Sequence, residues 1–129
     1  TMAFWDWPQW EHELDWMALH GVTMPLVVLG REAVMMRLLL ELGLAQEAVL
    51  EFFTGPAFLA WHRMGNLKRF GGPLPLGYLR HSEALTRRML ARARELGMRP
   101  VLPGFGGHVP DQLQELFPSE PFSRLPLWS

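Results

Sequence analysis

The chain has 129 residues, of which 49% are hydrophobic and 19% charged, and its formal net charge is −1. This length suffices for one domain with a hydrophobic core, and the composition is that of a globular protein, neither disordered nor fibrous. The near-neutral charge gives no reason to expect nucleic acid or an anionic membrane surface as a partner. The absence of cysteine excludes disulfides and thiolate metal sites without fixing a compartment.

No targeting segment is visible in the sequence. Residues 1–20 carry four acidic side chains where a signal peptide needs an apolar core, and the longest apolar run, residues 24–29, is far too short to span a bilayer. The chain opens on FWDWP and stops at PLWS, and neither end resembles a natural terminus. We therefore expect a truncated piece of a larger protein, whose localisation the sequence leaves unknown.

Two parts of the chain share one pattern of a helix, a glycine, a short apolar run, a glycine turn and a second helix. In the first part a helix from Trp10 stops at Gly21, the apolar run covers residues 22–29, and the helix reads REAVMMRLLLELG. In the second part LTRRMLARARELG ends at Gly97, the run covers residues 98–102, and the helix reads HVPDQLQELF. Apolar runs that alternate with helices predict parallel strands covered by helices.

The pattern is compatible with two folds, a doubly wound sheet and a (β/α) barrel, and two strands do not choose between them. Pro25 removes a ladder hydrogen bond from the first strand, so we expect a bulge or a late start, with residues 26–29 best paired. Between the two parts the sequence predicts helices over residues 44–53 and 76–96. The expected fold is thus α/β and helix-rich, with a long helical crossover between two parallel strands, and insertions this long are more often functional than idle.

The glycine turn at residues 104–108 follows a strand and precedes a helix, as a phosphate-binding loop does. It fails the dinucleotide fingerprint because Val109 takes the sixth position, and a plain turn is the simpler interpretation. The five histidines lack metal-ligand spacing, so we predict no metal and no cofactor. His108 is the best of them for touching a ligand, because it follows the C-terminal end of a strand.

Glu32 is the single candidate acid at a strand end, and its alternative role is to complement the dipole at a helix N-terminus. Glycosidic cleavage normally needs two facing carboxylates, so the chain lacks a complete catalytic set. Early tryptophans at 5, 7, 10 and 16 are predicted to pack in the core. In contrast, Trp61, Met64 and Trp128 are expected on loops and turns, where an aromatic face serves either as a sugar platform or as a lid over the core.

Long motifs rich in Trp and Pro run in order through nearly the whole chain. They read WDW and WEHELDWMALHG near the start, FFTGPAFLAWHRMGNL and GPLP in the middle, and PVLPGFGGHVP near the end. In these motifs the chain resembles glycoside hydrolase family 89, the α-N-acetylglucosaminidases. Arg31 departs from the family pattern, which commonly has Gln there, and Met35 or Met36 stands where relatives carry a Trp.

The resemblance implies a partial TIM (β/α)8 barrel, with residues 1–129 forming the N-terminal portion of a catalytic domain. The parent would be a retaining exo-glycosidase that removes terminal α-linked N-acetyl-D-glucosamine from glycans such as heparan sulfate, without metal. Its partners would be that glycan, the remainder of the barrel and a C-terminal helical domain. Family members are lysosomal in animals and periplasmic or secreted in bacteria.

Three positions match the family's sugar pocket: Trp61, Met64 and Trp128. The family's acid/base glutamate directly follows an asparagine, whereas the only asparagine here, Asn66, precedes Leu67. The resemblance therefore implies that both catalytic glutamates lie elsewhere and that the isolated piece is inactive.

Two other classes of protein stay open on the residues alone. One is a non-catalytic carbohydrate-binding module that uses loop tryptophans, and the other is a doubly wound nucleotide-binding domain that uses the glycine turn. Two barrel strands on their own leave unpaired edges and an uncovered apolar face, so we expect the isolated chain to aggregate or to stay partly molten.

Overall fold

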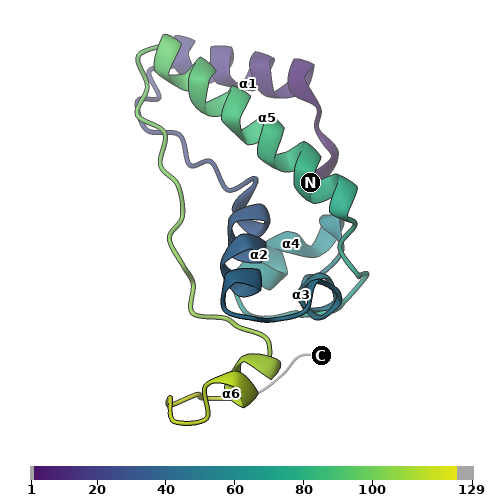
Figure 1. The fold of residues 1–129 in the computed structure, drawn as a ribbon. Coiled ribbons are helices and arrows are strands. Elements are labelled where there is room, and N and C mark those ends of the chain that lie inside the picture. The colour runs from purple at the N-terminus through teal and green to yellow at the C-terminus, as the bar shows by residue number, and fades with distance from the viewer. Residues whose placement is uncertain (1, 125–129) are drawn as a thin grey trace.

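The computed structural model describes residues 2–124, and within them helices joined by long irregular segments are the only regular elements beyond one isolated bridge (Figure 1). The α-helices predicted from the sequence are all present, with slightly different bounds, and α4 and two short 3-10 helices are additional. In chain order the elements are η1 Met2–Phe4, α1 Trp7–Leu19, α2 Arg31–Glu41, α3 Gln46–Phe52, η2 Pro56–Phe58, α4 Leu59–Arg63, α5 Leu76–Glu95 and α6 Gln112–Leu116.

Local sequence chemistry sets the ends of α1. Asp6 precedes the helix and accepts a hydrogen bond from the backbone N–H of Trp7 at 2.9 Å, while the side chain of Gln9 accepts from the backbone of Asp6 at 3.1 Å. This reciprocal capping box satisfies donors that the first turn leaves free. Gly21 and Gly97 follow α1 and α5 with φ of +76° and +77°, as predicted for left-handed residues after a helix.

The two apolar runs lie side by side and parallel, but they do not form regular strands in the described residues. Backbone hydrogen bonds join Val27 N to Val101 O at 2.9 Å, Val101 N to Pro25 O at 2.9 Å and Arg99 N to Thr23 O at 2.8 Å, around a single parallel bridge between Leu26 and Val101. The expected pairing of residues 26–29 is therefore wrong, because the bonds fall at 23, 25 and 27. In a parallel ladder the N–H of residue 25 would donate to the carbonyl of Arg99, and proline has none.

The first apolar run alternates between a covered and an open face. Pro25, Val27 and Leu29 are buried, whereas the side chains between them are exposed, with Leu26 at 64%. The exposed apolar side chains on the two runs are Met24, Leu26, Val28, Val101 and Leu102. Such alternation is the mark of a strand with one face packed on helices. The covering helices are α1 and α5, which lie alongside each other (Figure 1).

Two apolar clusters form the interior. One joins α1, α5 and the apolar runs through Trp10, Leu14, Val27, Leu85, Met89 and Met98, and the other joins α2, α3, α4 and the start of α5 through Leu39, Val49, Phe53, Leu59 and Leu79. Trp5, Trp7 and Trp10 pack in the first cluster as predicted. Trp16 does not, because it lies on the outer side of α1, 47% exposed and stacked on His20.

Candidate functional site

The apolar stretch FFTGPAFLAWHRMGN folds as a helix end, a tight turn, η2 and the short helix α4. Phe52 and Phe53 end α3 in the core, and Pro56 opens η2 at its first position. A Cβ on Gly55 would overlap the carbonyl of Gly71, so only glycine fits at this crossing. The hydroxyl of Thr54 is buried without a hydrogen-bond partner, so it does not cap this turn.

Helix α4 has an exposed and an anchored side. Trp61 and Met64, three positions apart, are 44% and 58% exposed, whereas Leu59 and His62 are buried. Residues at this spacing share one side of a helix. Sequence reasoning placed Trp61 on a loop, and the structure corrects this, because Trp61 lies within α4 and Met64 directly follows it. The third predicted pocket residue, Trp128, lies outside the described residues.

A buried ion pair connects α4 to α2. Arg63 donates from Nε to Oε1 of Glu32 and from Nη2 to Oε2, both at 2.8 Å, and Glu32 is only 2% exposed. Such a bidentate pair fixes both distance and orientation. Glu32, the candidate acid at the end of the first apolar run, has both carboxylate oxygens engaged by Arg63. The structure therefore supports a structural role for Glu32 at the start of α2 over a role as a catalytic acid.

His62 is enclosed by aromatic rings on the anchored side of α4. Its ring meets Phe52 and Phe53 edge-on, with centroids 4.9 Å and 5.5 Å apart, and Nδ1 is buried without a partner. Burial lowers the pKa of His62 to about 4, which the nearby Glu32 carboxylate and a backbone hydrogen bond with Leu67 oppose only partly. The imidazole is therefore neutral at physiological pH.

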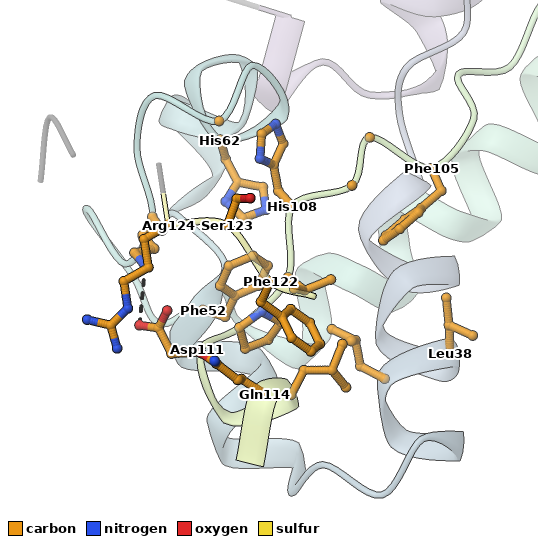
Figure 2. A pocket seen from close by; sticks show the side chains of 18 of the residues that line it. Leu38, Phe52, His62, Phe105, His108, Asp111, Gln114, Phe122, Ser123 and Arg124 are labelled. Atoms are coloured by element: carbon orange, nitrogen blue, oxygen red, sulfur yellow. Dashed lines mark hydrogen bonds and ion pairs between the residues drawn. The ribbon is translucent and has the colours of Figure 1, made fainter. Parts of the chain in front are cut away.

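A cavity of about 680 Å³ lies beside α4, between the end of α2 and the segment that leads into and past α6 (Figure 2). His62 and His108 line its upper part in this view, with Phe52 and Phe122 below them. Lys68 and Asp111 form an ion pair at its edge at 3.3 Å. Trp61 and Met64 do not line this cavity, whereas His108 does.

The glycine turn has no phosphate-binding geometry. Gly104, Gly106 and Gly107 are exposed, and the following helix, α6, starts only at Gln112 and has five residues. The plain-turn interpretation is therefore the better one. Arg31, the departure from the family pattern, lies against this turn, because a Cβ on Gly106 would come within 2.5 Å of its Nη2.

Within residues 2–124 no group of three or more His, Asp or Glu side chains is arranged to hold a metal ion. Among the described helices none is both long and apolar enough to cross a membrane.

Comparison with known proteins identifies the family. The family model of the α-N-acetylglucosaminidase (NAGLU) TIM-barrel domain matches residues 1–129. Human α-N-acetylglucosaminidase is 47% identical over 128 residues, which are 99% of this chain and 17% of that protein. The chain belongs to the α-N-acetylglucosaminidase TIM-barrel family.

Solved structures of this family are similar in fold to this chain. CpGH89, the family 89 glycoside hydrolase of Clostridium perfringens, superimposes with a TM-score of 0.86 at 44% identity, over 92% of this chain and 13% of the CpGH89 chain. One structure is a variant with two glutamates changed to glutamine, bound to its substrate GlcNAc-α-1,4-galactose, and others hold 2-acetamido-1,2-dideoxynojirimycin or PUGNAc. This chain therefore spans between about an eighth and a sixth of the relatives that it matches.

Sequence reasoning in this family member missed the importance of Arg63 and His62. Both stand in an otherwise apolar stretch, and a lone charged or polar residue in such a stretch requires a partner when it is buried. The isolated polar residues in this apolar stretch therefore indicated that partners exist. The partner of Arg63, Glu32, lies 31 positions earlier in the chain, and the sequence pattern does not identify a pair so far apart.

Proposed function

We propose that residues 1–129 are the N-terminal portion of a (β/α)8 catalytic domain in a retaining exo-glycosidase that hydrolyses terminal α-linked N-acetyl-D-glucosamine. Family membership supports this proposal, as does the binding of GlcNAc-α-1,4-galactose by CpGH89. The parallel pairing of the two apolar runs is the arrangement of neighbouring barrel strands. Active sites of such barrels lie at the C-terminal ends of their strands.

The observation that carries the proposal is the exposed pair Trp61 and Met64 on an anchored helix. The exposure of these side chains beside buried anchors leaves an aromatic face and a thioether available for contact with a ligand, and both positions match the family's sugar pocket. The face of an indole ring accommodates the C–H face of a sugar. We assign Trp61 and Met64 to one wall of the sugar pocket, together with Trp128 by its match to the family.

The two catalytic glutamates belong to parts of the protein beyond this chain. A retaining glycosidase needs one carboxylate as nucleophile and a second as acid and base, about 5 Å apart. Glu32 is occupied by Arg63, and Asp111 is paired with Lys68. The proposed mechanism uses no metal or cofactor, and the natural substrate belongs to glycans such as heparan sulfate.

The remainder of the barrel is the proposed partner of the exposed apolar face. Met24, Leu26, Val28 and Val101 are exposed on the side not covered by α1 and α5, and in the proposed barrel they would face the interior. Further barrel strands would pair with the free edges and bury these side chains, and a C-terminal helical domain would complete the enzyme.

The test compares the complete protein with the isolated chain of residues 1–129. The complete protein should cleave an aryl α-N-acetylglucosaminide, GlcNAc-α-1,4-galactose and heparan-derived oligosaccharides that end in α-linked N-acetylglucosamine, with retained anomeric configuration by NMR. The isolated chain should cleave none of them. If the isolated chain instead folds alone and binds N-acetylglucosamine in a tryptophan-fluorescence titration, it is a carbohydrate-binding module. Hydrolysis by the isolated chain would contradict the placement of the glutamates.

A further inference from the structure

We propose that Glu32 and Arg63 are positioning residues for the sugar pocket, because their ion pair fixes α4 and thereby orients Trp61 and Met64. This inference rests on the proposed function of Trp61 and Met64. The pair itself is largely buried, whereas Trp61 and Met64 are exposed. Neither side chain is proposed to touch the sugar.

Helix α4 cannot hold its own orientation. It has only five residues and no side-chain cap at its N-terminus, and a helix this short is not stable without tertiary contacts. Its apolar anchors, Leu59 and the His62 ring, pack against the second core cluster. These packing contacts hold α4 on the core but specify its orientation less sharply than a bidentate pair of hydrogen bonds does.

Arg63 supplies the missing direction. Its guanidinium meets the Glu32 carboxylate through two parallel hydrogen bonds of 2.8 Å, and the planar fork allows only one relative orientation. Arg63 lies between the two exposed residues in the sequence, two positions after Trp61 and one before Met64. A rotation of α4 that displaces Arg63 would therefore break the fork.

Glu32 is itself held on a rigid base. It stands in the first turn of α2, where the helix dipole favours a carboxylate. The preceding Gly30 has φ of +78°, and a Cβ there would lie 2.6 Å from Oγ1 of Thr86. That hydroxyl donates to Ser82 O at 2.7 Å within α5. The start of α2 is thus packed tightly on α5, and Glu32 transmits that fixed position to α4.

A buried ion pair such as Glu32–Arg63 contributes more to the relative orientation of two helices than to the free energy of unfolding. Replacement of such a pair by apolar residues of similar volume is often neutral or stabilising, because the desolvation of both charges offsets their attraction. A buried pair that joins two elements is thus better explained by the orientation that it enforces. If the pair positions α4, its removal should alter sugar binding more than thermal stability, whereas a merely structural pair should affect mainly stability.

The experiment uses the complete protein and the double substitution E32L/R63M, which removes both charges and keeps an apolar interior. We expect its thermal midpoint to stay near that of the parent, while KM for an aryl α-N-acetylglucosaminide rises about 10-fold and kcat changes little, the mark of lost ground-state binding. The affinity for 2-acetamido-1,2-dideoxynojirimycin should fall in parallel. The matched control is R37Q/E83Q, which removes the exposed ion pair between α2 and α5 and should leave KM unchanged.

A double-mutant cycle with W61A identifies the route of the effect. If the pair acts through Trp61, E32L/R63M should add little to the KM of W61A, because the side chain that it orients is already gone. A folded E32L/R63M variant with parental KM, or KM changes that add fully to those of W61A, would overturn the inference. If E32L/R63M does not fold, R63K decides by the same KM and kcat comparison, since it keeps the buried charge and loses the fork.

The outcomes also separate this inference from the proposed function. A parent protein that hydrolyses the substrate, with unaltered KM in the folded variants, refutes the positioning role alone. A parent that neither hydrolyses nor binds α-N-acetylglucosaminides refutes both.

Discussion

The imidazole of His108 lies directly against Gly65, so the glycine turn and the end of α4 are packed on each other. Gly65 has φ of +74°, and a Cβ at this position would overlap the His108 ring. Gly65 is therefore required twice, for its backbone conformation and for the space that His108 fills. The contact joins two segments that lie 43 positions apart in the sequence, and Gly65 and His108 both line the cavity beside α4.

Substitution of Gly65 by Ala should destabilise the protein by about 2 kcal/mol or more, because the left-handed φ alone costs an L-residue roughly 1–2 kcal/mol. The measurement is the thermal midpoint of the complete protein. The control is Gly77→Ala in the first turns of α5, where a Cβ would meet nothing within 4 Å. There we expect a gain of roughly 0.5–1 kcal/mol. Equal effects at the two glycines would contradict this account.

Replacement of Trp61 by Ala in the complete protein should lower kcat/KM for an aryl α-N-acetylglucosaminide about 10- to 100-fold, or roughly 1.5–3 kcal/mol, with the loss mainly in KM. The physical reason is the lost contact between the indole and the sugar ring. Trp16→Ala is the matched control, since Trp16 is equally exposed but lies on α1. A loss of activity in the Trp16 variant that equals the loss in the Trp61 variant would count against the pocket assignment.

Met64→Ala should also raise KM, by a smaller factor of about 3- to 10-fold, because a thioether offers less contact area than an indole. Leu19→Ala serves as its control, being a highly exposed apolar residue on α1. Steady-state kinetics on the same aryl substrate provide the measurement. An unchanged KM would remove Met64 from the proposed pocket wall.

His62 should make stability depend on pH between about 4 and 6.5. Its folded pKa, about 4, lies below the ordinary value of 6.5, so in this window the unfolded state binds more protons than the folded state. Stability is thus complete above pH 6.5 and falls as the pH drops, by about 3 kcal/mol in total. Thermal midpoints of the complete protein at a series of pH values should show a shallower decline in His62→Gln. The exposed His12 gives the control variant, His12→Gln, and an identical decline in both variants would refute the role of His62.

The exposed apolar face predicts opposite effects of one substitution in two contexts. In the isolated chain Leu26→Lys should reduce aggregation and the binding of a hydrophobic dye, because Leu26 is exposed there. In the complete protein the same change should cost ~3 kcal/mol or more, since the proposed barrel buries an unpaired charge. A cooperative, monomeric melt of the unmodified isolated chain would contradict the view that this face needs the rest of the barrel.

The sequence predicted much of the helical framework because its signals are local. The glycines at 21 and 97, where α1 and α5 were predicted to end, act on the backbone next to them. The strands were harder to predict, because a strand is defined by its neighbours. Here each apolar run has one partner, and Pro25 removes a further bond, which leaves a single bridge instead of a ladder.

The sequence alone determined the family, through motifs long enough to be specific, and the positions of the helices, through periodicity and caps. It also indicated Trp61 and Met64 as candidates for the sugar pocket. Only the tertiary structure decided that Glu32 is paired with Arg63 and that His62 is enclosed by Phe52 and Phe53. The physical reason is distance along the chain. Buried charges and rings contact residues that are remote in the sequence, and local sequence patterns do not predict such contacts.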